Sequence, residues 1–252
     1  MARTPLIAGN WKMYKTEREA EDYIQALLPR VAALEGVELA LCAPFTALEA
    51  LADSARGSRV EVFAQNMHEA PEGPYTGEVS APMLREVGVQ GVVLGHSERR
   101  QHFAESDRAL ALKVPAALEA GLRPLLCVGE SESERDAGDT ERRLRQQVGD
   151  DLAGVSEERL AEVVIAYEPC WAIGTGRVAS PEQAQEAIAF IRALLRARSA
   201  PAADAVRVLY GGSVKPENAA ELLALPDVDG ALVGGASLEA ESFAQIAAAA
   251  PR

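Results

Sequence analysis

Eight short apolar segments recur along the 252-residue chain, and segments with a helical pattern separate them. The apolar segments are continuous, without polar alternation, which is typical of parallel strands covered on both faces. The predicted strands are Leu6–Gly9, Val37–Ala43, Val60–Gln65, Gly91–Gly95, Arg123–Val128, Val163–Tyr167, Val206–Tyr210 and Gly230–Val233. Their spacing of roughly 31 residues is that of one strand–helix unit. The pattern predicts an α/β fold, with residues 1–252 forming a single-domain (β/α)8 barrel.

Two helices can be predicted with their first residues. Residues Thr16–Leu34 carry one apolar stripe, and Ser180 and Pro181 stand where an N-cap and a first helical residue are expected. An open dinucleotide-binding sheet is the main alternative to a barrel. The Gly-x-Gly-x-x-Gly motif that such a sheet needs after its first strand is absent from this sequence.

Composition excludes several classes of protein. With 48% apolar and 25% charged residues, the chain is neither disordered nor a bundle of membrane helices. A net charge of −13 disfavours nucleic-acid binding, although one cleft can still be locally positive for a small anion. Three widely spaced cysteines without a CxxC pair, and only three histidines, predict neither a disulfide framework nor a metal site. We expect a cytoplasmic protein without a membrane segment.

The carboxyl ends of the predicted strands carry the candidate functional residues, since barrel active sites lie at those ends. Two of these ends carry glycine pairs, Gly211-Gly212 and Gly234-Gly235, after strands seven and eight. A single glycine pair is usually a turn. Two pairs at these particular ends predict a phosphate site, because glycine lets backbone N–H groups approach an anion closely.

The remaining strand ends suggest proton transfer. Glu168 follows the sixth strand and can act as a general base, although an ion pair at the barrel rim is an equally ordinary role. Lys12 follows the first strand and can neutralise an oxyanion, or can be a solvated loop lysine. His96 follows the fourth strand, where it can exchange protons or serve only as a structural hydrogen-bonding group.

Several motifs in these loops resemble those of the triosephosphate isomerase family, in the same order and over essentially the whole chain. They are Gly9-Asn10-Trp11-Lys12-Met13, Ala64-Gln65-Asn66, Tyr75-Thr76-Gly77-Glu78, Gly95-His96-Ser97-Glu98-Arg99-Arg100, Ala166-Tyr167-Glu168-Pro169, Trp171-Ala172-Ile173-Gly174-Thr175-Gly176, Tyr210-Gly211-Gly212-Ser213-Val214 and Val233-Gly234-Gly235-Ala236. Each motif alone is weak, whereas the set is specific.

The resemblance implies an enzyme of glycolysis and gluconeogenesis that interconverts dihydroxyacetone phosphate and glyceraldehyde 3-phosphate through an enediolate. It implies that Glu168 is the base, that neutral His96 exchanges protons with the substrate oxygens, and that Lys12 and Asn10 stabilise the intermediate. The phosphate-binding N–H groups are then those of Gly174, Ser213, Gly234 and Gly235. The resemblance implies no metal or organic cofactor. It also implies a lid over Pro169–Gly176.

The resemblance further implies a homodimer in which the loop Glu72–Glu78 docks beside the partner's Lys12 loop. Three positions depart from the common family pattern. Cys170 replaces a frequent valine at the lid hinge, Pro74 a frequent alanine in the docking loop, and Asp139 a frequently basic residue.

Two other functions remain open from the residues alone. An aldolase or synthase acting on a phosphorylated sugar could use the same glycine pairs, but it needs a Schiff-base lysine or a second acid pair inside the barrel. Lys113 and Lys215 lie outside the predicted strands. A non-catalytic barrel would be expected to lack one of Glu168, His96 and Lys12, and the chain has all three.

Overall fold

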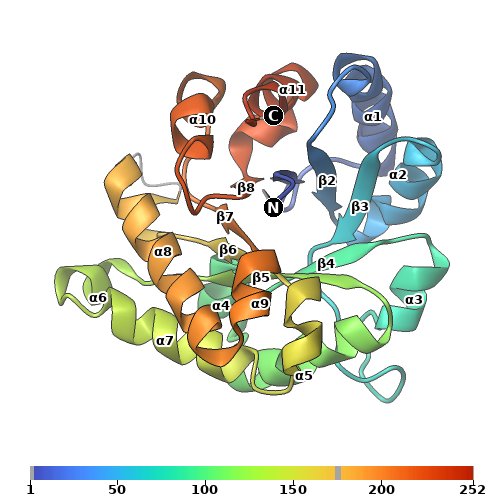
Figure 1. Ribbon diagram of the computed structural model, residues 1–252. Helices are drawn as coiled ribbons and strands as arrows, with labels where there is room; N and C mark the ends of the chain where they lie inside the picture. Colours follow the sequence, from blue (N-terminus) through green and yellow to red (C-terminus); the bar gives the residue numbers. More distant parts are fainter. Residues whose placement is uncertain (1–2, 174–176, 252) are drawn as a thin grey trace.

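The computed structural model describes residues 3–173 and 177–251, and over these residues it is a closed barrel of parallel strands surrounded by helices (Figure 1). The strands are β1 (Leu6–Asn10), β2 (Glu38–Ala43), β3 (Val60–Ala64), β4 (Gly91–Leu94), β5 (Arg123–Val128), β6 (Val164–Tyr167), β7 (Arg207–Tyr210) and β8 (Gly230–Val233). Each pairs in parallel with the next strand along the chain, and β8 pairs with β1. The predicted fold class is confirmed, with each strand boundary within one residue of the prediction.

The helices follow the strands along the chain. The α-helices are α1 (Glu17–Val31), α2 (Leu48–Ala55), α3 (Ala81–Glu86), α4 (Ser97–Phe103), α5 (Asp107–Glu119), α6 (Glu132–Asp136), α7 (Thr140–Asp151), α8 (Pro181–Arg198), α9 (Ala200–Ala205), α10 (Pro216–Leu223) and α11 (Ala240–Ala248). Short 3₁₀ helices are η1 (Phe45–Ala47), η2 (Glu157–Glu162), η3 (Cys170–Ala172) and η4 (Gly235–Leu238). None of the helices in the described part of the chain has the length and hydropathy needed to cross a membrane.

The predicted helix starts are correct, and one predicted end is wrong. Thr16 and Ser180 cap α1 and α8, and each forms a capping box with the third residue of its helix. The first helix ends at Val31, three residues before Leu34. The apolar pattern continues to Leu34 because this side chain still packs against the core after the helix has ended.

Two apolar layers account for the continuous apolar strands. One layer fills the barrel interior with side chains such as Leu6, Phe63 and Leu209, and the other lies between strands and helices. Closure at the β8–β1 seam depends on Gly230, whose φ is +137°. A Cβ at this position would lie 1.9 Å from the carbonyl oxygen of Leu6, so a side chain here would separate the two strands.

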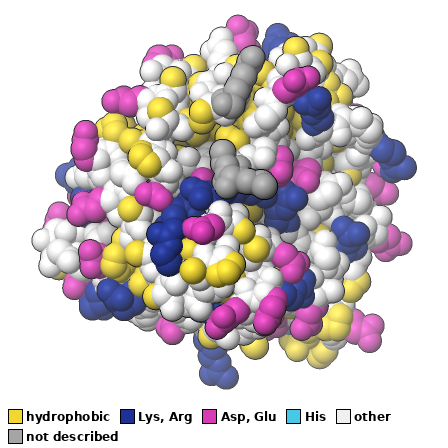
Figure 2. All heavy atoms as spheres, in the orientation of Figure 1, with side chains coloured by type: hydrophobic (Ala, Val, Ile, Leu, Met, Phe, Trp, Pro, Cys, Tyr) yellow, Lys and Arg dark blue, Asp and Glu magenta, His cyan; other side chains and the backbone are white. Residues whose placement is uncertain are grey.

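Ion pairs occupy the amino ends of the strands. Arg123 contacts Glu38 and Glu61 at 3.1 and 2.8 Å, and Arg207 contacts Glu38 at 2.6 Å. All four residues are the first or second of their strands. Figure 2 shows Lys or Arg side chains beside Asp or Glu side chains near the centre of the face on which the chain begins. Such pairs at this end of a barrel serve stability, because active sites form at the other end.

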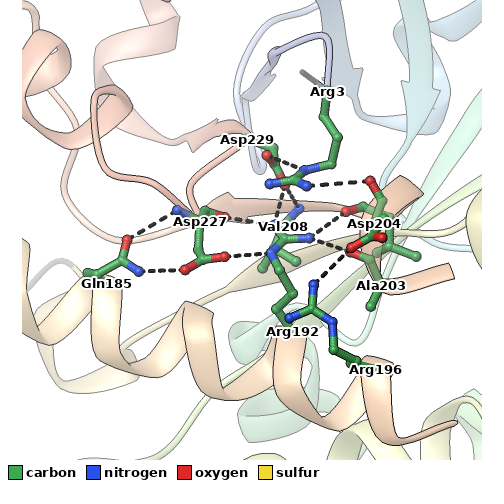
Figure 3. Close-up of polar contacts among 10 residues, drawn as sticks. Arg3, Gln185, Arg192, Arg196, Ala203, Asp204, Val208, Asp227 and Asp229 are labelled. Atoms are coloured by element: carbon green, nitrogen blue, oxygen red, sulfur yellow. Dashed lines mark hydrogen bonds and ion pairs between the residues drawn. The ribbon is translucent and has the colours of Figure 1, made fainter. Parts of the chain in front are cut away.

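Arg192 of α8 lies at the centre of a buried polar network at the same end of the barrel (Figure 3). Its guanidinium contacts Asp227 at 2.8 Å and Asp229 at 2.6 Å, and it also donates to the carbonyls of Ala203 and Val206. Asp229 in addition pairs with Arg3, at 2.6 Å. One buried cation therefore connects α8 to the segments that lead into β7 and β8.

We expect Arg192→Met to lower the free energy of unfolding by about 3 kcal/mol, because it removes a buried cation from the buried carboxylate of Asp229, which then pairs with Arg3 alone among the described residues, and from the half-buried carboxylate of Asp227. Urea denaturation followed by circular dichroism measures the change. Arg196→Met is the matched control, since Arg196 lies one turn further on, is exposed and pairs only with the exposed Asp204 among the described residues. Its effect should stay below about 1 kcal/mol. Equal effects of the two substitutions would contradict this account of the network.

Candidate active site

The carboxyl ends of the strands surround a cavity of about 920 Å³. Of the predicted site residues, those that line the cavity are Asn10, Lys12, His96, Glu168, Ser213, Gly234 and Gly235. Gly174, predicted to bind phosphate, lies outside the described residues. The loops after five different strands thus bring the described members of the predicted site to one opening.

The loop after β1 holds Lys12 in an uncommon backbone conformation, with a φ of +54°. The Lys12 N–H donates to Asn10 Oδ1 at 3.0 Å. The side-chain amide of Gln65, after β3, donates to the Lys12 carbonyl at 2.8 Å and to the Cys42 carbonyl at 2.9 Å. These contacts hold a conformation that costs roughly 1–3 kcal/mol in isolation. The Lys12 ammonium lies 2.5 Å from a carboxylate oxygen of Glu98.

His96 and Glu168 form a buried pair, with side chains only 8% and 2% exposed. His96 Nε2 lies 3.0 Å from Glu168 Oε1, and the backbone N–H of Ser97 donates to Glu168 Oε2 at 2.8 Å. The other ring nitrogen, Nδ1, accepts a hydrogen bond from the Glu98 N–H at 3.3 Å. In the neutral ring the proton therefore lies on Nε2, directed at the carboxylate.

Opposing effects set the pKa values of this pair. Burial alone would raise the pKa of Glu168, but the charge and hydrogen bond of His96, with the Ser97 N–H, hold the pKa below its ordinary value. Burial lowers the pKa of His96, whereas the Glu168 carboxylate raises it and prevails. Glu168 is consequently ionised at neutral pH, as a general base has to be.

The backbone of Gly234 and Gly235 forms another part of the cavity wall. Among the described residues, a Cβ on Gly235 would meet no atom within 4 Å, and one on Gly234 would meet only Lys12 Cε, at 3.5 Å. Gly234 precedes the 3₁₀ helix η4, and its carbonyl accepts from the N–H and hydroxyl of Ser237. The backbone of Gly234 and Gly235 therefore has room for a ligand beside Lys12, and the hydrogen bonds from Ser237 fix its conformation. The glycine pair leads directly into this short 3₁₀ helix.

Three polar residues near the site were not among the predicted site residues. Gln65 holds the Lys12 loop, Glu98 pairs with Lys12, and buried Glu130 accepts hydrogen bonds from Tyr167 and Trp171 at 3.0 and 2.9 Å. Gln65 and Glu98 lie in the motifs that resemble the family and stand at the carboxyl ends of the third and fourth predicted strands, and these two features are the sequence signal for them. Glu130 follows β5, and its contact with Trp171 connects this strand to the segment after Glu168.

A barrel with a buried acid–base pair, a lysine and open backbone at the carboxyl ends of its strands belongs to the (β/α)8 class of enzymes. The family model for triosephosphate isomerase matches residues 5–250. Two similar chains are the triosephosphate isomerases of Rubrobacter xylanophilus, 55% identical, and Symbiobacterium thermophilum, 53% identical, with at least 97% of each chain covered. A crystal structure of triosephosphate isomerase from Bartonella henselae has a TM-score of 0.89 and 40% identity over 98% of both chains. The chain therefore belongs to the triosephosphate isomerase family, and it is an aldose–ketose isomerase.

The geometry of the pair predicts how the pKa of Glu168 responds to substitution. In His96→Gln the imidazole charge is gone while burial remains, so the pKa of the Glu168 carboxyl should rise. Carbon-13 NMR titration of this carboxyl, assigned by comparison with Glu168→Gln, measures the shift. His102→Gln is the control, since His102 is exposed. An unchanged or lower pKa in His96→Gln would show that His96 does not stabilise the carboxylate.

Proposed function

We propose that Glu168 is the base that interconverts dihydroxyacetone phosphate and D-glyceraldehyde 3-phosphate. Its carboxylate removes a proton from the carbon beside the carbonyl, which leaves an enediolate, and returns the proton to the neighbouring carbon. The observation that carries this proposal is the buried contact of 3.0 Å between Glu168 and His96, in a cavity that Lys12 also lines. A carboxylate in such a dry site can accept a proton without first shedding a full water shell.

His96 and Lys12 act on the substrate oxygens in this scheme. The Nε2–H of His96 donates to the developing oxyanion and moves a proton between the two oxygens. The Lys12 ammonium and the Asn10 side chain stabilise the negative charge of the enediolate. Both oxygens of Glu168 are occupied by His96 and Ser97, so the carboxylate has to leave at least one of these contacts to reach the substrate carbon.

The backbone of Gly234 and Gly235, with that of Ser213, holds the phosphate group in this proposal. The space around Gly235 supports it, as does the proximity of Gly234 to the Lys12 side chain. Gly174, outside the described residues, contributes a further N–H from the lid over Pro169–Gly176. Each step transfers a proton and no electrons, so the scheme calls on no cofactor. We propose that residues 1–252 act as one domain in the cytoplasm, in glycolysis and gluconeogenesis.

The positions of Lys113 and Lys215 favour this reaction over Schiff-base chemistry. Lys113 lies in α5, with its ammonium against Glu105 and Asn66. Lys215 is the residue before α10. Neither is on a strand, where a lysine that attacks a carbonyl inside the barrel would have to be.

Shortening the base tests its role. Glu168→Asp moves the carboxylate back by one methylene, roughly 1.5 Å, which is enough to spoil the geometry of attack. We expect turnover to fall at least ~100-fold with KM little changed, measured by coupling dihydroxyacetone phosphate formation to a dehydrogenase. Glu182→Asp, an exposed change in the first turn of α8, should leave turnover unaltered. A Glu168→Asp enzyme with normal turnover would remove Glu168 from the mechanism.

We also propose that the chain acts as a homodimer. Met13 and Tyr14, directly after Lys12, are 92% and 59% exposed, and Tyr75 in the loop Glu72–Glu78 is 46% exposed. The Tyr75 ring stacks on His68 with centroids 4.0 Å apart, which keeps the loop ordered. Large apolar groups at a catalytic loop favour an interface over open solvent. In the dimer, Tyr75 of one subunit covers the segment after Lys12 of the other.

A charge at this surface should separate the subunits. We expect Met13→Glu to give a monomer by sedimentation velocity and a turnover at least ~10-fold lower, because the Lys12 loop loses its cover. Leu112→Glu is the matched control, since Leu112 is a 53% exposed apolar residue on α5, away from this loop. A fully active wild-type monomer at assay concentration would refute the proposal.

A further inference from the structure

The residue before His96 is held at both of its backbone polar groups. Gly95 follows β4 and has a φ of +71°, so the chain turns sharply before it reaches the catalytic histidine. Its N–H donates to the buried carboxylate of Glu105 at 3.1 Å. Its carbonyl accepts from Arg100 Nε at 2.7 Å. The peptide units that orient His96 are thus tied to two charged side chains.

Arg100 makes more contacts than a surface ion pair requires. Besides Gly95, its guanidinium donates to the Cys127 carbonyl of β5 at 2.9 Å, and it pairs with Asp151 of α7 at 2.6 Å and with Asp107 of α5 at 2.5 Å. Its side chain is 13% exposed, and that of Asp151 is fully buried. The planar guanidinium of Arg100 therefore links the carboxyl ends of β4 and β5 to helices α5 and α7.

The space around Gly95 is matched to this side chain. A Cβ on Gly95 would lie 2.9 Å from Arg100 Nη2 and 3.2 Å from the Cys127 carbonyl oxygen. Glycine is needed here because of its positive φ and because the guanidinium occupies the place of a side chain. The buried carboxylate of Asp151 lies on the far side of Nη2 and keeps the guanidinium in that place.

We propose that Arg100 is a positioning residue for the isomerase reaction, which holds the Gly95 carbonyl and thereby aims His96 and the Ser97 N–H at Glu168. This inference rests on the function proposed above. Arg100 touches neither substrate nor Glu168, and it acts through the peptide that precedes His96. The contacts of Glu168 at 3.0 and 2.8 Å come from His96 and Ser97, so a shift of this segment disturbs both.

Arg100→Lys tests the proposal while keeping the positive charge. A lysine ammonium can pair with one of the two carboxylates, but it lacks the fork that also reaches the two carbonyls. We expect kcat to fall at least ~10-fold and KM to change less than about 3-fold, because a displacement near 1 Å is costly in rate. The inhibition constant of inorganic phosphate should stay within about 2-fold, since the proposed phosphate site lies on other strands.

The pH profile separates positioning from a general loss of stability. His96 and the Ser97 N–H hold the pKa of Glu168 down against its burial. If they move away in Arg100→Lys, this pKa rises, and the acidic limb of kcat/KM moves to higher pH. A purely structural role would lower the melting temperature without moving that limb.

Arg143→Lys is the matched control. Arg143 also pairs with Asp107, at 3.1 Å, and its side chain is 22% exposed, but among the described residues its contacts include neither Gly95 nor Cys127. It should leave kcat and the acidic limb unchanged. Equal effects of the two lysine substitutions, or an Arg100→Lys enzyme with wild-type kcat and pH profile, would overturn the proposal. An inactive wild-type enzyme would instead refute the proposed function.

A second variant carries the test if Arg100→Lys does not fold. Asp151→Asn keeps the volume of the buried side chain but removes the carboxyl group that pairs with Nη2. We expect a fall in kcat of at least ~3-fold with the acidic limb shifted in the same direction. Wild-type values of both quantities in folded Asp151→Asn would equally overturn the proposal.

Discussion

Closure of the parallel sheet is the constraint on which the rest of the structure depends. Each strand has both of its edges hydrogen-bonded once β8 pairs with β1, so no edge is left to pair with another chain. Since the strands are parallel, their carboxyl ends all meet at one rim. Residues as distant in the sequence as Asn10 and Gly235 then line one cavity. Gly230 makes this possible, because a side chain there would collide with the backbone of Leu6.

The two ends of the barrel use charged groups for different purposes. At the amino ends, carboxylates and guanidinium groups such as Glu38 and Arg123 satisfy one another and leave little net charge to act on a ligand. At the carboxyl ends, Lys12 and the pair of His96 and Glu168 line an open cavity. These side chains form ion pairs and hydrogen bonds with their neighbours, and they can exchange those contacts for contacts with a substrate. This division separates the groups that stabilise the fold from the groups that the proposed reaction uses.

The site depends on a second layer of contacts for its geometry. Gln65 holds the strained backbone at Lys12, and Glu130 holds Trp171 after Glu168. Arg100 and Glu105 hold the peptide groups on either side of Gly95. All of these supporting side chains belong to loops or helices that follow strands β3 to β5. The few side chains that the proposed reaction uses are thus positioned by hydrogen bonds from residues that take no part in the reaction.

Sequence alone determined the barrel. Eight continuous apolar strands that alternate with helices form a parallel sheet, and closing that sheet into a barrel buries both of its faces. The sequence also located Asn10, Lys12, His96, Glu168, Ser213 and the glycine pair at 234–235 at one rim, since the carboxyl ends of parallel strands coincide. What it could not determine were contacts between loops. The acceptors of the Gln65 amide, the partner of Lys12 and the four groups around Arg100 lie up to 86 residues along the chain from the side chains that they contact. Only the tertiary structure decided them, because differences of a few tenths of an ångström in interatomic distance decide which groups are hydrogen-bonded, and residue patterns carry no information at that scale.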